Sequence, residues 1–99
     1  MVEKEPLFGG TTAYSAGVIW IPGNRHGRAL GIPDSKEEAL TYLQGEAGNR
    51  LNLELANAFL DNCNPAVEFI ENNTHARYEA VPVWADYHPT RPGAAQGRV

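Results

Sequence analysis

The stretch that decides the fold is GGTTAYSAGVIW at residues 9–20, which follows Val2-Glu3-Lys4 after a short linker. The Val2-Glu3-Lys4 segment is typical of a strand end, and an acidic side chain such as Glu3 at a strand end can bind ribose hydroxyls. Gly9 and Gly10 lack the Cβ atoms that would keep the backbone away from a pyrophosphate. Together these two segments predict one half of a nucleotide-binding site.

The same turn is rich in hydroxyl groups. Thr11, Thr12 and Ser15 supply hydroxyls, and the backbone between Gly10 and Gly17 supplies N–H donors. Such groups suit a phosphate or the edge of a planar ring. The alternative interpretation is a glycine-rich turn that joins two elements and binds nothing. The full dinucleotide fingerprint G-x-G-x-x-G does not occur in this sequence.

Length, charge and cysteine content exclude several classes of protein. The 99 residues allow one domain at most, and a net charge of −4 argues against nonspecific binding to nucleic acid or anionic membranes. A single cysteine, Cys63, excludes an internal disulfide and a cysteine-rich zinc site, and we expect it to be buried. The spacing of His26, His75 and His88 predicts no metal site. Because no apolar run is long enough to cross a bilayer, we expect a cytoplasmic location.

Hydrophobic patterning predicts two short strands that are far apart in the sequence, and a surface loop after the first of them. Val18–Ile21 is a β-branched and aromatic run closed by Pro22-Gly23, and residues 76–83 alternate loosely. Residues 23–34 contain three glycines and a proline, which favours a surface loop. This loop holds three basic side chains that either face solvent or contact a phosphate, namely Arg25, His26 and Arg28.

The middle of the chain is predicted to be helical. Ser35 is the expected N-cap of a first helix, with Glu38 completing a capping box and Gly48 marking the end. A second helix is expected to begin near Asn52. The Asn64-Pro65 pair is typical of a cap followed by a first-turn proline, so a third helix is expected from there to Asn73.

A second group of reactive side chains follows these helices. Asp86-Tyr87-His88-Pro89 places a carboxylate, a phenol and an imidazole together, and Pro92-Gly93 follows. Loops often hold catalytic groups, and a tyrosine can transfer a proton if a partner accepts it. The alternative is an ordinary proline-containing loop with exposed polar side chains.

Several short motifs, in order along nearly the whole chain, resemble a known family. The segment containing Glu3 and residues 8–15 looks like the second strand and FAD-contact segment of the fumarate reductase and succinate dehydrogenase flavoproteins. Further motifs resemble their 3-ketosteroid Δ1-dehydrogenase branch. These motifs are Val18-Ile19-Trp20-Ile21-Pro22-Gly23, Gly31-Ile32-Pro33-Asp34-Ser35, Ala39-Leu40-Thr41-Tyr42-Leu43, Asp86-Tyr87-His88-Pro89 and Arg91-Pro92-Gly93.

The resemblance implies an α/β fold, namely part of a Rossmann-like FAD-binding domain that is mainly helical in the part present, with short strands. It implies that Glu3 contacts the adenosine ribose of FAD. Tyr87 matches a tyrosine that supports the proton-accepting tyrosine of the ketosteroid enzymes, which makes it the catalytic candidate. The residues expected to line the pyrophosphate and flavin are Gly10, Thr11, Thr12, Ser15, Ala16, Gly17 and Val18.

The resemblance also divides the chain, as a partial FAD-binding domain over residues 1–99, into three parts. Residues 1–23 form the FAD-contact segment, residues 35–73 a helical insertion, and residues 76–99 a strand with a Pro/Gly-rich loop. The family's first strand and glycine-rich phosphate loop are expected before Val2, and its catalytic domain after Val99. Two departures from the family pattern are Ala16, where many relatives have glycine, and the Ala94-Ala95 pair.

Two functional hypotheses follow. In the first, the chain is a piece of an FAD-dependent dehydrogenase that oxidises a carbon–carbon bond of a ketosteroid-like small molecule by hydride transfer to flavin. Its partner would be the remainder of that flavoprotein, and the isolated chain would be inactive. In the second, the chain is a non-catalytic remnant or small helical interaction module that binds a partner through amphipathic helices.

Overall fold

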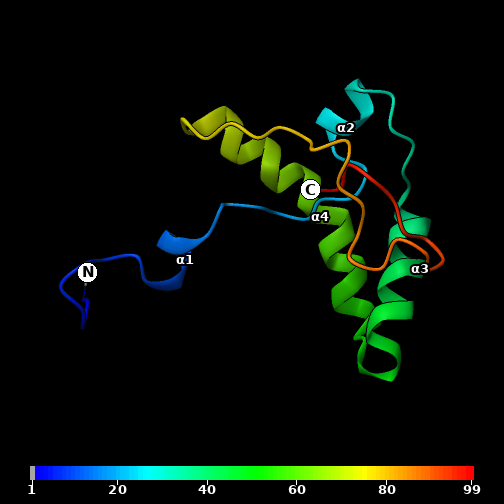
Figure 1. Ribbon diagram of the computed structural model, residues 1–99, viewed down its shortest axis with the longest axis horizontal. Helices are drawn as coiled ribbons and strands as arrows, with labels where there is room; N and C mark the ends of the chain where they lie inside the picture. Colours follow the sequence, from blue (N-terminus) through cyan, green and yellow to red (C-terminus); the bar gives the residue numbers. More distant parts are fainter. Residues whose placement is uncertain (1) are drawn as a thin grey trace.

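The computed structural model describes residues 2–99, and helices dominate this part of the chain (Figure 1). Figure 1 shows α3 and α4 side by side and antiparallel, with the segment that carries α1 extending away from them. We call residues 2–17 the N-terminal arm and the rest of the described chain the body. The radius of gyration is 15.4 Å, larger than the roughly 13 Å of a compact 100-residue domain, because the N-terminal arm projects outward. The elements are α1 (Gly10–Tyr14), α2 (Arg25–Ala29), α3 (Lys36–Ala47), the 3₁₀ helix η1 (Gly48–Arg50) and α4 (Leu53–Asn73).

Helix α3 begins and ends where the sequence predicts. The Ser35 side chain accepts a hydrogen bond from the Glu38 N–H at 3.1 Å, and Gly48 caps the other end with a φ of 53°. The second half of the expected capping box differs. Asp34 Oδ1, at 2.8 Å, accepts the Ser35 N–H that a Glu38 carboxylate would take in a capping box. The helix start is therefore fixed by two adjacent side chains.

Helix α4 is one continuous helix, so the prediction of a new helix at Asn64-Pro65 is wrong. Asn52 is the N-cap, as expected, and its Oδ1 accepts from the Leu55 N–H at 3.0 Å. Pro65 lies inside the helix, where it has no N–H to donate to the carbonyl of Asp61. Figure 1 shows that the helix changes direction near its middle, as a proline in a helix interior causes.

The apolar core lies between α3 and α4 and explains why α4 continues past its proline. Buried side chains occur on both sides of Pro65, so packing against the rest of the chain holds both halves of one helix. Trp20, which precedes both helices in the sequence, packs against this core and stacks on Phe59 with ring centroids 6.2 Å apart. Burial of Cys63 is confirmed. The buried apolar residues are Ala39, Tyr42, Ala56, Leu60, Cys63 and Val67.

The predicted strands do not form. Val2-Glu3-Lys4, Val18–Ile21 and residues 76–83 are all irregular. Within residues 2–99 the only β pairing is an isolated antiparallel bridge between Ala85 and Gln96. The expectation of an α/β fold with short strands is therefore corrected to a mainly helical chain with almost no strand.

The reason is a shortage of backbone partners. Residues 18–21 are joined to the C-terminal segment by a backbone hydrogen bond, in which the Ile21 N–H donates to the Arg98 carbonyl at 2.6 Å. Val81 similarly donates to the carbonyl of Val99 at 2.8 Å. These bonds are too scattered to form a ladder, and a strand needs a neighbour that pairs along its length.

Residues 23–34 are also more ordered than the surface loop predicted for them. They contain α2, whose N-cap Asn24 accepts a hydrogen bond from the Gly27 N–H at 2.7 Å. The same asparagine donates to the carbonyls of Ile21 at 2.9 Å and Gly97 at 2.8 Å. Asn24 thus ties the short helix to both the preceding segment and the C-terminal segment.

Candidate functional site

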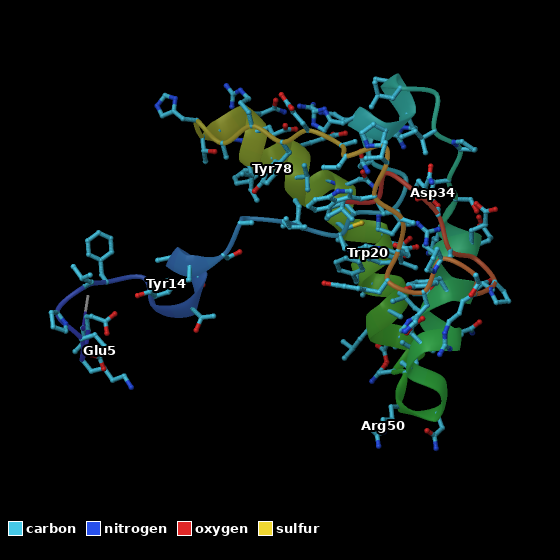
Figure 2. All side chains as sticks on the ribbon, viewed as in Figure 1. Glu5, Tyr14, Trp20, Asp34, Arg50 and Tyr78 are labelled. Carbon is cyan, nitrogen blue, oxygen red and sulfur yellow. The ribbon has the colours of Figure 1, made fainter. Side chains whose placement is uncertain are left out.

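The N-terminal arm carries most of the predicted cofactor residues and lies apart from the helical body. Figure 2 shows Glu5 and Tyr14 on this arm, whereas Trp20 lies among the side chains of α3 and α4. The Glu3 carboxylate accepts hydrogen bonds from its own neighbours, the N–H groups of Lys4 at 2.7 Å and Glu5 at 3.1 Å. The expected turn around Thr11–Ser15 does form as α1, and all of it is exposed.

A first cleft lies where the arm joins the body. Its volume is about 230 Å³, and Ala16, Gly17 and Val18 line it together with His26 and Arg77. Gly17 has a φ of 72°, and no atom lies within 4 Å of the position that a Cβ would occupy. The structure therefore brings three of the predicted cofactor residues to one cleft. Glu3, Gly10, Thr11, Thr12 and Ser15 do not line it.

Two of the three basic residues of this segment, Arg25 and His26, are paired with Glu71 of α4, whereas Arg28 is exposed to solvent as one of the two interpretations expected. Arg25 Nη2 lies 2.5 Å from Glu71 Oε2, and His26 Nε2 lies 3.0 Å from Glu71 Oε1. The Tyr78 N–H also donates to Oε1, at 3.1 Å. Burial would raise the pKa of Glu71, but these hydrogen bonds and the Arg25 charge outweigh it and leave the pKa below its usual value.

A second, larger cleft lies on the α3 side of the body. Its volume is about 920 Å³, and its walls are mostly apolar, with Trp20, Tyr42 and Trp84 among the residues that line it. Tyr87 also lines this cleft and is 99% exposed. Val18 lines both clefts, so the predicted cofactor segment passes between them.

The structure separates the side chains of the Asp86-Tyr87-His88 group. Asp86 is buried and bound to the body, whereas the Tyr87 phenol faces solvent. The His88 ring turns to α3, where its Nδ1 lies 2.8 Å from Glu46 Oε1. The three side chains therefore do not form a relay, and Tyr87 is the member of the group that is free to meet a ligand.

The sequence analysis missed a buried ionic network centred on Arg98. Its Nη2 donates to Asp34 Oδ1 and its Nη1 to Asp86 Oδ2, each at 2.7 Å. Its Nε donates to Asp34 Oδ2 at 3.0 Å, and the guanidinium carbon lies 5.5 Å from the centroid of the Trp20 ring. Burial would lower the pKa of Arg98, but both carboxylates outweigh it and raise the pKa. No local pattern links residues so far apart in sequence, so no sequence signal could have identified this network.

Comparison with known proteins shows what kind of domain holds these clefts. The model of the FAD binding domain family (FAD_binding_2) matches residues 1–98. The chain belongs to this FAD-binding family. Its relatives include a 3-oxosteroid 1-dehydrogenase of Mycobacterium tuberculosis (strain ATCC 25618 / H37Rv), 38% identical over 97 residues, which are 98% of this chain and 17% of the relative. A 4-oxocyclohex-2-ene-1-carboxylate 5-dehydrogenase of Sinomonas cyclohexanicum is 42% identical over 97 residues, 98% of this chain and 16% of the relative.

These comparisons confirm the resemblance and the FAD assignment made from the sequence. A 3-oxosteroid 1-dehydrogenase of Comamonas testosteroni is 33% identical over 97 residues, again 98% of this chain and 17% of the relative. The chain thus spans about a sixth of the length of the relatives it matches. No solved structure matches it significantly.

The residues present in this member of the FAD-binding family fit the cofactor in part. The exposed backbone at Ala16–Val18 lines a cleft, and the open space at the Gly17 Cβ position leaves room for a ligand to approach. Glu3 and Gly10–Ser15 line neither cleft. Arg77 is already engaged, because its Nη1 donates to the carbonyls of Glu71, Thr74 and Ala76.

Among residues 2–99 no helix is both long and apolar enough to cross a membrane.

Proposed function

We propose that this chain works as part of a larger FAD-dependent dehydrogenase that oxidises a carbon–carbon bond next to the carbonyl of a cyclic, ketosteroid-like ketone. The observation that carries the proposal is the match along 98% of the chain to relatives named as dehydrogenases of 3-oxosteroids and of oxocyclohexene carboxylates. Both names describe a ring that bears a ketone. A small-molecule substrate of this class follows from that common feature.

The proposed cofactor residues bind and orient FAD. When bound, the flavin of FAD would serve as the hydride acceptor. Glu3 contacts the ribose of the adenosine half. In the complete protein, the arm lies against FAD as part of a Rossmann-like domain. The remaining cofactor contacts are proposed for Gly10, Thr11, Thr12, Ser15, Ala16, Gly17 and Val18.

Tyr87 is the proposed catalytic residue of this segment. It lines the larger cleft and its phenol is free, which leaves it able to support proton transfer from a substrate in that cleft. The apolar walls of the cleft, which include Trp20 and Trp84, suit the rings of a cyclic ketone. This arrangement favours residues 1–23 as the FAD-contact segment and residues 76–99 as a substrate-facing loop, with the helices of residues 35–73 between them.

The proposal is tested with Tyr87→Phe in the complete flavoprotein. We expect the variant to keep its flavin and to reduce it more slowly with a 3-oxosteroid in a stopped-flow assay, by about 10²-fold or more, because a positioned acid–base group contributes that much. Tyr14→Phe is the matched control, since Tyr14 is exposed and lines neither cleft. An unchanged reduction rate in Tyr87→Phe would show that the phenol has no chemical role.

The isolated chain provides a second test. We expect it to bind FAD weakly or not at all and to show no turnover, because five of the eight proposed cofactor residues line neither cleft. The measurement is flavin absorbance retained after desalting. A stoichiometric flavin complex of the 99 residues would contradict this expectation.

A non-catalytic interaction module is the second candidate, and one observation favours it. Leu55 and Phe69 on α4 are each 67% exposed, which leaves apolar surface for a partner on this helix. A colourless protein whose helical signal rises with its concentration would support this candidate. A yellow complex that contains the chain would support the dehydrogenase.

A further inference from the structure

We propose that Asp86 is a positioning residue that, held by Arg98 and Trp20, fixes the backbone which presents Tyr87 to the larger cleft. The inference rests on the function proposed above, because it assigns a purpose to Asp86 through Tyr87. Asp86 also lines the larger cleft, but its carboxylate oxygens are bound to donors of this chain, so it acts through Tyr87 in this proposal.

The Asp86 carboxylate accepts hydrogen bonds from three donors, which belong to two segments of the chain. Trp20 Nε1 donates to Oδ1 at 2.6 Å, and Arg98 Nη1 and the Ala95 N–H donate to Oδ2 at 2.7 and 3.0 Å. The Asp86 N–H donates in turn to the Ala95 carbonyl at 3.0 Å. The residue before Tyr87 is thus fixed through both its side chain and its backbone.

The residue after Tyr87 is fixed as well. The His88 N–H donates to the Tyr42 hydroxyl at 3.3 Å, and the His88 ring pairs with Glu46 at 2.8 Å. Both acceptors belong to α3, the helix that forms one wall of the core. Tyr87 is therefore a fully exposed side chain on a backbone that is held on either side.

This combination is costly for a loop that has no ligand to meet. Burying a carboxylate removes its hydrogen bonds to water, which costs free energy. For Asp86 this cost is offset by hydrogen bonds from one charged guanidinium and two N–H donors. A positioned catalytic group needs such support, since a displacement of about 1 Å can cost 10²-fold in rate. Asp86 supplies this support, and it directly precedes Tyr87, whose phenol is exposed at the cleft.

A double-mutant cycle in the complete flavoprotein tests the proposal. Asp86→Asn keeps the size of the side chain and removes its charge. With a 3-oxosteroid as the probe, we expect Asp86→Asn to slow flavin reduction about tenfold, but by less than about twofold when Tyr87 is already phenylalanine. A purely structural role for Asp86 would slow both backgrounds by the same factor, and that result would overturn the proposal.

Asp61→Asn is the matched control. It removes the carboxylate of an exposed pair with Lys36, so we expect no change in either background. If Asp86→Asn does not fold, Asp86→Glu replaces it in the cycle. That change keeps the charge but moves the carboxylate by one methylene from the donors of Trp20, Ala95 and Arg98, and the same non-additive result is expected.

The outcomes separate the two proposals. If Tyr87→Phe alone leaves the reduction rate unchanged, the proposed role of Tyr87 fails and the positioning role fails with it. If Tyr87→Phe slows reduction and the Asp86 effect is additive to it, the positioning role alone fails. On the 99-residue chain, the ¹⁵N heteronuclear NOE of the Tyr87 amide gives a further readout. We expect it to fall in Asp86→Asn and to stay unchanged in Asp61→Asn.

Discussion

Replacing Arg98 by methionine is expected to be strongly destabilising. The Arg98 side chain is 0% exposed, and its partners Asp34 and Asp86 are 6% and 1% exposed. Methionine fills much of the same space but leaves two buried carboxylates without their cation. Breaking a buried ion pair from one side costs about 3–5 kcal/mol, whereas a domain of this size has only about 5–15 kcal/mol of stability in total.

The assay is urea denaturation of the 99-residue chain, followed by the helical signal in circular dichroism. We expect the free energy of unfolding to fall by about 3–5 kcal/mol, or the chain to be largely unfolded without denaturant. Arg50→Met is the matched control because Arg50 is exposed in η1, and a change of about 0.5 kcal/mol or less is expected there.

A rescue experiment separates lost packing from unpaired charge. If the cost comes from the two carboxylates, adding Asp34→Asn and Asp86→Asn to Arg98→Met should recover part of the stability, because neutral amides are less costly to bury than carboxylates. A loss of less than about 1 kcal/mol in Arg98→Met would refute the reasoning, since the network would then contribute no more than a surface ion pair.

Two further predictions concern single contacts. Gly93→Ala should destabilise the chain by about 2–5 kcal/mol in the same urea assay, because the φ of 78° costs about 1–2 kcal/mol and a Cβ 2.2 Å from the Glu38 carbonyl oxygen adds about 1–3 kcal/mol. Gly31→Ala, with a similar φ of 75° but open space around the Cβ position, should cost about 1–2 kcal/mol through backbone strain alone; equal losses at both sites would contradict the steric argument. Glu71 has a lowered pKa in the folded state, so its contribution is present above the ordinary glutamate pKa of about 4.3 and is lost as pH falls through the folded value. Stability measured from pH 6 to pH 2 should therefore fall less steeply in Glu71→Gln than in the wild type, and parallel curves would show that Glu71 does not contribute.

The helix starts could be predicted because they depend on local chemistry. Ser35 and Asn52 each accept a backbone N–H three residues later, and this contact requires only neighbours in sequence. Pro65 was misread for the converse reason. Its local preference for a first helical turn is real, but packing on both sides of it holds one continuous helix, and packing is a property of the whole fold.

The sequence predicted the family and the candidate residues of the site, but not which of these residues lie together. Short motifs identified the FAD-binding family and marked Tyr87, because family membership is carried by the order of residues along the chain. The same motifs did not show that Glu3 would lie outside the cleft lined by Ala16–Val18. Which segments share a cleft depends on how the arm and the body are arranged, and a linear pattern does not contain that information.

The sequence by itself therefore determined the helix starts at Ser35 and Asn52, the family and the cofactor class, since each depends on residues close together or on their order. Only the tertiary structure decided that the β-branched segments stay irregular, because strands depend on neighbours that pair with them. It alone joined Asp34, Asp86 and Arg98, whose charges are stable when buried only because folding brings them within hydrogen-bonding distance of one another.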